Sequence, residues 1–157
     1  MRPRHESPLA QGVVMNVSNL LATKGHDVAT ISRERSVSDA LEVLRERDIG
    51  ALVVTALNEP LAGIISERDI VRALARQGGA ALELTVHELM TPNVSVCDET
   101  TSLTSLMGLM TSQHIRHVPV IRGDQVVGLV SIGDVVKARF DELEHEKQEL
   151  IDYVSAR

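Results

Sequence analysis

The stretch Gly63-Ile64-Ile65-Ser66-Glu67-Arg68-Asp69 occurs twice in this chain, since it returns in altered form as Gly128-Leu129-Val130-Ser131-Ile132-Gly133-Asp134. Each copy follows an apolar run and leads into a helical pattern, so each Ser stands where a helix should begin. Helix N-termini present free backbone N–H groups to anions. The two copies therefore indicate a duplicated module with two equivalent clefts.

The duplication extends over most of the chain. Each copy predicts a short leading helix, a strand, an amphipathic helix, two strands and a second helix, which is an α+β fold of two β-α-β-β-α repeats packed face to face. We expect a flexible arm over 1–15, repeats over 16–79 and 80–139, and an amphipathic helix over 140–157. The matched segments are 17–21 with 86–90, 28–31 with 94–97, 37–44 with 103–110, 49–54 with 115–120, and 61–66 with 126–131.

Composition excludes several classes of protein. The net charge of −6 argues against nucleic acid or an anionic membrane as the main partner. The only aromatic residues, Phe140 and Tyr153, lie near the end of the chain, so the body has no platform for stacking bases. A single Cys97, with no signal peptide or membrane-spanning run, suits a cytoplasmic protein.

The signatures also suggest how a ligand would be held. Gly63 and Gly128 carry no side chain, so a ligand ring could approach the strand closely. Ser66 and Ser131 could cap a helix or donate a hydrogen bond to a phosphate. A carboxylate one turn later would repel phosphate, and its natural partners are ribose hydroxyls.

The same signatures have a purely structural interpretation. Ser-x-x-Asp at the start of a helix approximates a capping box, which stabilises the helix without any ligand. Asp69 and Asp134 could serve either purpose or both. The preceding glycine and the repetition favour the ribose interpretation.

With these motifs the chain resembles a tandem pair of cystathionine β-synthase (CBS) domains, or Bateman module, over residues 16 to 139. The resemblance rests on the two signatures, on Met90-Thr91-Pro92 and on Ile115-Arg116-His117-Val118-Pro119-Val120. It implies a regulatory module, not an enzyme, that binds AMP, ADP, ATP or NAD(H) between the repeats and signals to an effector protein. S-adenosylmethionine binding, and a structural subunit without a ligand, remain the alternatives.

The resemblance also suggests roles for the turn before each second strand. A basic pair, Arg116 and His117, would meet the phosphates of a ligand whose ribose Asp134 holds, and would make that cleft the tighter site for phosphorylated ligands. Gly50 and Ala51 at the matching positions would open space for the same ligand. The alternative is a solvated basic pair.

Further candidates complete the predicted site. Arg68 replaces Gly133 of the second signature and either reaches a phosphate near Asp69 or faces solvent, while Lys24 is another phosphate candidate. Aliphatic walls for adenine are predicted at Val28, Ile49, Val94 and Ile115, which are equally suited to an ordinary core. No metal site is expected, because His114 and His117 lack further ligands at known spacings.

The last predicted helix is charged but carries apolar residues at Phe140, Leu143, Leu150, Ile151 and Val154, with Lys147 interrupting the series. Two heptads are too few to establish a coiled coil. We expect this helix to dock on its own module or on a second copy, so that the protein forms a homodimer.

Overall fold

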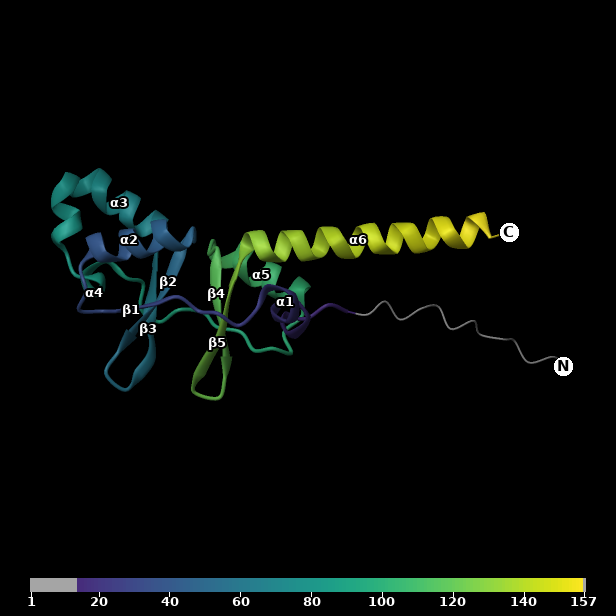
Figure 1. The fold of residues 1–157 in the computed structure, drawn as a ribbon, viewed down its shortest axis with the longest axis horizontal. Coiled ribbons are helices and arrows are strands. Elements are labelled where there is room, and N and C mark those ends of the chain that lie inside the picture. Colours follow the sequence, from purple (N-terminus) through teal and green to yellow (C-terminus); the bar gives the residue numbers. More distant parts are fainter. Residues whose placement is uncertain (1–13, 157) are drawn as a thin grey trace.

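The structure is a computed structural model that describes residues 14–156, and Figure 1 shows its arrangement. The predicted α+β fold is confirmed. The first repeat contains β1 (Thr30–Ser32), α2 (Val37–Arg47), β2 (Ala51–Ala56), β3 (Glu59–Ser66) and α3 (Glu67–Gln77), and the second contains α5 (Leu103–Gln113), β4 (His117–Arg122), β5 (Gln125–Ser131) and α6 (Ile132–Ser155). The short helices α1 (Val17–Lys24) and α4 (Val86–Leu89) precede them, and a 3₁₀ segment spans Gly78–Glu83.

The two repeats carry sheets of different size. In the first, β1 runs parallel to β2, and β2 pairs antiparallel with β3; in the second, β4 and β5 form an antiparallel pair. The predicted strand over 94–97 is wrong, because there only Cys97 pairs, through one parallel bridge to Val120. The reason lies in the neighbouring Pro119, which has no N–H to continue the ladder. At the equivalent place in the first repeat, Val53 N–H donates to Ala29 O at 3.1 Å.

The leading helices are exchanged between the repeats. The buried residues Val17, Leu20 and Leu21 of α1 belong to the core built on the second sheet, whereas Val86 of α4 belongs to the core built on the first. Backbone hydrogen bonds fix the exchange, with Val17 N–H donating to Thr101 O at 2.9 Å. Figure 1 accordingly shows α1 beside α5, and α4 near α2 and α3. Each core is therefore completed by the segment that precedes the other repeat.

The two signature glycines make this exchange possible. A Cβ atom on Gly128 would lie 2.7 Å from Leu21 Cδ2, and one on Gly63 would lie 2.6 Å from the backbone oxygen of Thr91. The close approach that these glycines permit is thus made by the protein's own chain. The expectation that they leave room for a ligand ring is wrong in this respect.

The last helix continues well beyond the second repeat. Val135 is buried in the second core, but the distal part of α6 projects away from the body (Figure 1), and Phe140, Leu143 and Leu150 are more than half exposed. Within residues 14–156, no helix is long and apolar enough to cross a membrane. The predicted arm over 1–15 lies largely outside the described residues, although Met15 O accepts a hydrogen bond from Leu103 N–H.

Candidate functional site

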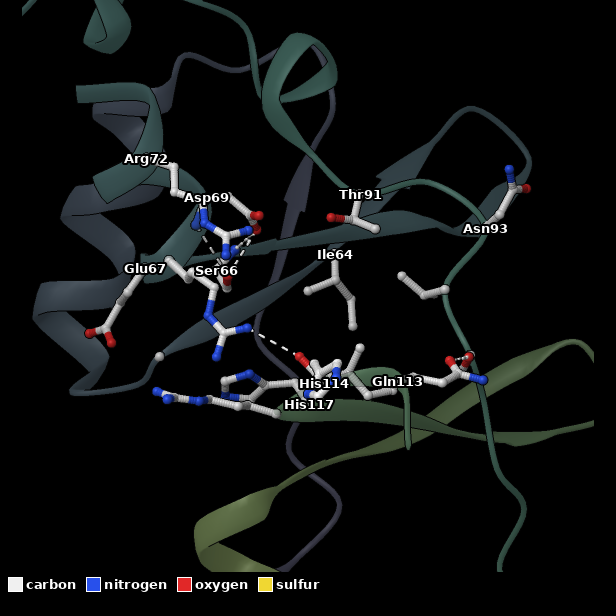
Figure 2. Close-up of a pocket in the computed structure, with 16 residues that line it drawn as sticks. Ile64, Ser66, Glu67, Asp69, Arg72, Thr91, Asn93, Gln113, His114 and His117 are labelled. Carbon is white, nitrogen blue, oxygen red and sulfur yellow. Dashed lines mark hydrogen bonds between the residues drawn. The ribbon is translucent and has the colours of Figure 1, made fainter. Parts of the chain in front are cut away.

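Two cavities lie where the repeats meet, and each contains one signature Asp. We call the first, of about 350 Å³, the Asp69 cleft, and the second, of about 560 Å³, the Asp134 cleft. The Asp69 cleft is lined by Gly50, Ile64, Ser66, Glu67, Arg68, Asp69, Arg72, Thr91, Asn93, Val94, Ser95, Gln113, His114, Ile115, Arg116 and His117 (Figure 2). The Asp134 cleft is lined by Lys24, Asp27, Ala29, Arg47, Asp48, Ile49, Gly50, Ala51, His117, Leu129, Ser131 and Asp134.

Most of the predicted site residues lie in one of these clefts. Each cleft joins the signature of one repeat to the helix-to-strand turn of the other, so that Asp69 faces 115–117 and Asp134 faces 49–51. A ligand in either cleft would touch both repeats. Four predicted residues line neither cleft: Gly63, Gly128, Gly133 and Val28. Ala29 takes the place expected for Val28.

Both signatures form complete capping boxes. In the Asp69 cleft, the Ser66 N–H and hydroxyl each donate to Asp69 Oδ2 at 2.8 Å. In the Asp134 cleft, the Ser131 N–H donates to Asp134 Oδ2 at 2.8 Å. The structural interpretation of Ser-x-x-Asp is therefore confirmed. Helices α2 and α4, which begin outside the two clefts, carry the same box, so the motif alone does not mark a ligand site.

The carboxylate of Asp134 is also paired with a cation. Lys24 Nζ lies 2.5 Å from Asp134 Oδ2 and also donates to the backbone oxygen of Leu129. Burial alone would raise the pKa of Asp134, but the hydrogen bonds from Lys24 and Ser131 outweigh it and lower that pKa. The helix that carries Lys24 is eight residues long, whereas its counterpart α4 has four, and the extra turn brings the ammonium to this cleft.

The Asp69 cleft is more basic than the sequence predicts. Arg68 donates from Nη1 to the backbone oxygen of His114 at 3.1 Å and thereby spans the two repeats. Figure 2 shows Arg72 beside Asp69 on α3, with His114 and His117 opposite them. Arg116 also lines this cleft. Its predicted association with Asp134 is wrong, and so is the ground for expecting the Asp134 cleft to be the tighter phosphate site.

His117 lines both clefts and so connects them. Burial lowers the pKa of His117, and the positive charges of Lys24, Arg116 and Arg68 lower it further, while the carboxylate of Asp134 opposes them. The imidazole is therefore neutral near pH 7 unless an anion joins it. Gly50 lies beside this ring, and a Cβ there would be at an ordinary contact distance of 3.5 Å from His117 Nε2.

Several lining residues were not predicted from the sequence. Arg72 follows Asp69 by three positions, so helical periodicity places both side chains on one face and could have identified it. Glu67 immediately precedes Arg68 in the quoted signature. Asn93, Gln113 and Asp48 lie in connections or at helix ends and carry no local pattern that points to a cleft. Within residues 14–156, no group of three or more His, Cys, Asp or Glu residues is placed to hold a metal ion.

Comparison with known proteins places this architecture in a family. The family model described as "CBS domain" matches residues 17–76 and 86–141. The CBS-domain containing protein ATU1752 of Agrobacterium tumefaciens is 43% identical, with 82% of this chain and 96% of that chain covered and a TM-score of 0.78. The mitochondrial CBS domain-containing protein CBSX3 of Arabidopsis thaliana is 37% identical over 147 residues, which are 88% of this chain and 71% of that protein.

A third relative was solved with ligands. The CBS domain pair of protein MJ0100, in complex with 5′-methylthioadenosine and S-adenosyl-L-methionine, is 26% identical with a TM-score of 0.73, covering 82% of this chain and 98% of that one. The two repeats of the structure coincide with the two matches to the family model. The chain belongs to the CBS-domain family and is a tandem pair of CBS domains.

Proposed function

We propose that this protein is a regulatory module that senses an adenine nucleotide, namely AMP, ADP, ATP or NAD(H), in the clefts between its repeats. The observation that carries this proposal is the composition of each cleft. The signature Asp of one repeat lies beside the helix-to-strand turn of the other, so a bound ligand would bridge the repeats. Binding would thus stabilise one relative orientation of the two halves over others.

The Asp69 cleft suits a phosphorylated ligand. The Asp69 carboxylate would accept hydrogen bonds from the ribose hydroxyls, because it still has free lone pairs beyond its capping bonds. Val94 and Ile115 would pack against the adenine. Arg68 and Arg116 would bind phosphate, with the positive end of the α3 helix dipole adding to the attraction.

The Asp134 cleft suits a different ligand. Its charged lining residues are Asp27, Asp48 and Asp134 against Lys24 and Arg47, an excess of one negative charge. This balance favours an adenosine compound that carries positive charge, such as S-adenosylmethionine, over a polyphosphate. The ligands of the MJ0100 pair are consistent with this second candidate.

The module would act through other proteins and not through catalysis. The clefts hold Ser and His side chains, but Ser66 and Ser131 have their hydroxyls engaged in capping boxes. An unidentified effector protein would read the orientation of the repeats. The competing proposal is a structural subunit whose signatures serve only as helix caps, and it predicts that no adenosine compound binds. A cytoplasmic location stays a prediction.

A homodimer is part of the proposal. Exposed positions on α6 recur at alternating intervals of four and three, as in a heptad seam: Val136, Phe140, Leu143, Lys147, Leu150 and Val154. Such a stripe on a helix that projects from the body needs a partner, and an identical helix would match it in length and pattern. Lys147 in the seam would restrict register and oligomer size.

The experiment is a thermal-shift panel with AMP, ADP, ATP, NAD⁺, NADH and S-adenosylmethionine on the purified protein. A ligand at about 100 times its Kd adds about 2.7 kcal/mol per site. For a chain of this length the melting temperature should rise by roughly 5–10 °C. A selective rise supports sensing, whereas no rise with any of the six compounds favours the structural subunit.

A further inference from the structure

The cations without a carboxylate partner are concentrated along one helix. Of the 16 Lys and Arg side chains, Arg2, Arg4 and Arg157 lie outside the described residues, which leaves thirteen, and eight of these form ion pairs. Within residues 14–156 the five without an ion pair are Arg68, Arg72, Arg76, Arg116 and Lys137. Of these five, only Lys137 lines neither of the two clefts nor a third cavity beside α3.

Three of these arginines form a row on α3. Arg68, Arg72 and Arg76 are spaced four residues apart, so they share one face of the helix at intervals of about 6 Å. Like charges four residues apart repel each other and so destabilise the helix that carries them. No carboxylate among the described residues forms an ion pair with any of the three. A row of this kind is suited to a ligand that carries several negative charges.

A third cavity continues the Asp69 cleft along this row. It has a volume of about 280 Å³, and we call it the α3 groove. Asp69 and Arg72 line both cavities, while Arg76 lines only the groove. The two cavities therefore adjoin at Asp69, which would hold the ribose, and at Arg72 one turn further along α3.

The groove holds two carboxylates, those of Asp69 and Glu88, beside Arg72 and Arg76, and neither carboxylate forms an ion pair with these arginines. Asp69 Oδ2 accepts from the N–H and hydroxyl of Ser66, and Glu88 Oε2 accepts from the N–H and hydroxyl of Thr85 at 2.7 and 3.0 Å. Both carboxylates are thus held in capping boxes of α3 and α4. The guanidinium groups of Arg72 and Arg76 keep their donors for a ligand.

We infer that the α3 groove is a polyphosphate subsite, so that the Asp69 cleft takes an adenosine compound with two or more linked phosphoryl groups. The inference rests on the proposed function, since it extends the same ligand. Arg68 and Arg116 hold the first phosphoryl group, Arg72 the second, and Arg76 the third. The subsite separates ADP, ATP and dinucleotides from AMP and from S-adenosylmethionine, which have no phosphoanhydride to place there.

The test is calorimetric titration of the full chain with adenosine, AMP, ADP, ATP and NAD⁺. Wild-type protein should bind ADP or ATP, or NAD⁺, at least fivefold more tightly than AMP. R72Q should weaken all three phosphoanhydride ligands by about five- to tenfold and AMP by less than twofold. R76Q should weaken ATP alone by a similar factor. K137Q removes the one unpaired cation of the described residues that lies outside these cavities, and it should change none of the affinities.

Each other outcome identifies which idea fails. AMP binding as tightly as the longer ligands, or R72Q and R76Q leaving the ratio of affinities unchanged, overturns the polyphosphate subsite while the proposed function stands. Equal weakening of AMP and ATP in R76Q also overturns it, because that result indicates only a general electrostatic contribution. Failure of adenosine and all four nucleotides to bind contradicts the proposed function itself. Melting temperatures of the variants verify that each is folded.

Discussion

Lys24 on the exchanged helix α1 and Asp134 at the start of α6 form an ion pair at 2.5 Å, although 110 positions separate them in the chain. The Lys24 ammonium is bound to Asp134 Oδ2, and the same carboxylate is the proposed acceptor for ribose hydroxyls. A ribose that binds this Oδ2 atom must displace Lys24, and we expect the displaced ammonium to be available to a phosphate.

K24M tests this relationship. Without the ammonium, the Asp134 carboxylate is free for ribose hydroxyls, so adenosine should bind the Asp134 cleft about three- to tenfold more tightly. AMP should gain less, because Lys24 no longer meets its phosphate. Calorimetric titration of both compounds gives the ratio of affinities, with K137M as the exposed control outside both clefts. An unchanged ratio would contradict both roles of Lys24.

The same variant should also change the response of stability to pH. The pKa of Asp134 is lowered, so its pairing stabilises the fold above the ordinary value near 3.8 and this contribution is lost as the pH falls through the lowered value. K24M should therefore lose at most about 1 kcal/mol near pH 7, since both side chains are partly exposed. The difference from wild type should shrink in acid, as measured by urea unfolding.

The signature carboxylates can be tested against a matched cap. D69A and D134A each remove a capping box, worth about 1 kcal/mol, together with the proposed ribose acceptor. D39A removes the box at the start of α2, which lines neither cleft. All three variants should melt earlier, but only D69A and D134A should weaken adenosine binding, by about tenfold or more.

If D39A weakens ligand binding as much as D69A does, the weaker binding of D69A is explained by lost stability and not by a lost ribose acceptor. A result in which none of the three affects binding would leave the signatures as caps alone, and the ribose role would be abandoned.

The sequence was sufficient to predict the duplicated fold because its signals are local. The periodic apolar positions of 37–44 and 103–110 identify α2 and α5, and the Ser residues mark the starts of α3 and α6. The absence of a strand over 94–97 also has a local signal, namely Pro119 in the adjacent strand, which offers no N–H to a partner. The predicted strand starts at 49 and 115 were two residues early, since β2 and β4 begin at Ala51 and His117.

The exchange of α1 and α4 could not be predicted from local pattern. An apolar helix face fits either core, and only the interlocked backbone contacts, such as Val86 N–H to Arg35 O at 2.8 Å, decide between them. The same arrangement decides that Arg116 lines the Asp69 cleft and not the Asp134 cleft. Local sequence also cannot show that Arg72 and Arg76 lack a carboxylate partner. That depends on the folded structure, in which the nearby Asp69 and Glu88 form capping boxes.

The glycines allow a direct test of the exchanged helices. G63A places a Cβ 2.6 Å from a backbone oxygen, which cannot turn away, whereas G128A meets the movable side chain of Leu21. G63A should therefore lower the free energy of unfolding more, with costs of about 1–3 kcal/mol for such overpacking. Urea unfolding measures both, and G79A, with open space around it, is the control. Equal stability of G63A and G79A would contradict the close approach.

His117 should give the protein a characteristic pH response. Its folded pKa lies below the ordinary value of 6.5, so the unfolded chain takes up this proton first as the pH falls. The contribution to stability is complete above about 6.5 and declines from there toward the lowered pKa. H117N should flatten that slope, and H145N on the exposed part of α6 should not. A bound phosphate should narrow the pH range of this decline, because it favours the charged imidazole and so raises the folded pKa toward the unfolded value. Thermal melts between pH 5 and 8 compare the three proteins; identical slopes would contradict the burial of this ring.

The seam on α6 predicts how the dimer breaks. L143K and L150K place a charge where two helices would meet, whereas Q148K adds the same charge on a neighbouring exposed position outside the seam. Wild type and Q148K should be dimers by light scattering at micromolar concentration, and both seam variants should be monomers that still bind nucleotide, because neither cleft includes α6 beyond Asp134. If the wild-type protein is a monomer in this measurement, the proposed homodimer through α6 is wrong. A dimer that persists in L143K and L150K would place the interface on another surface of the two repeats.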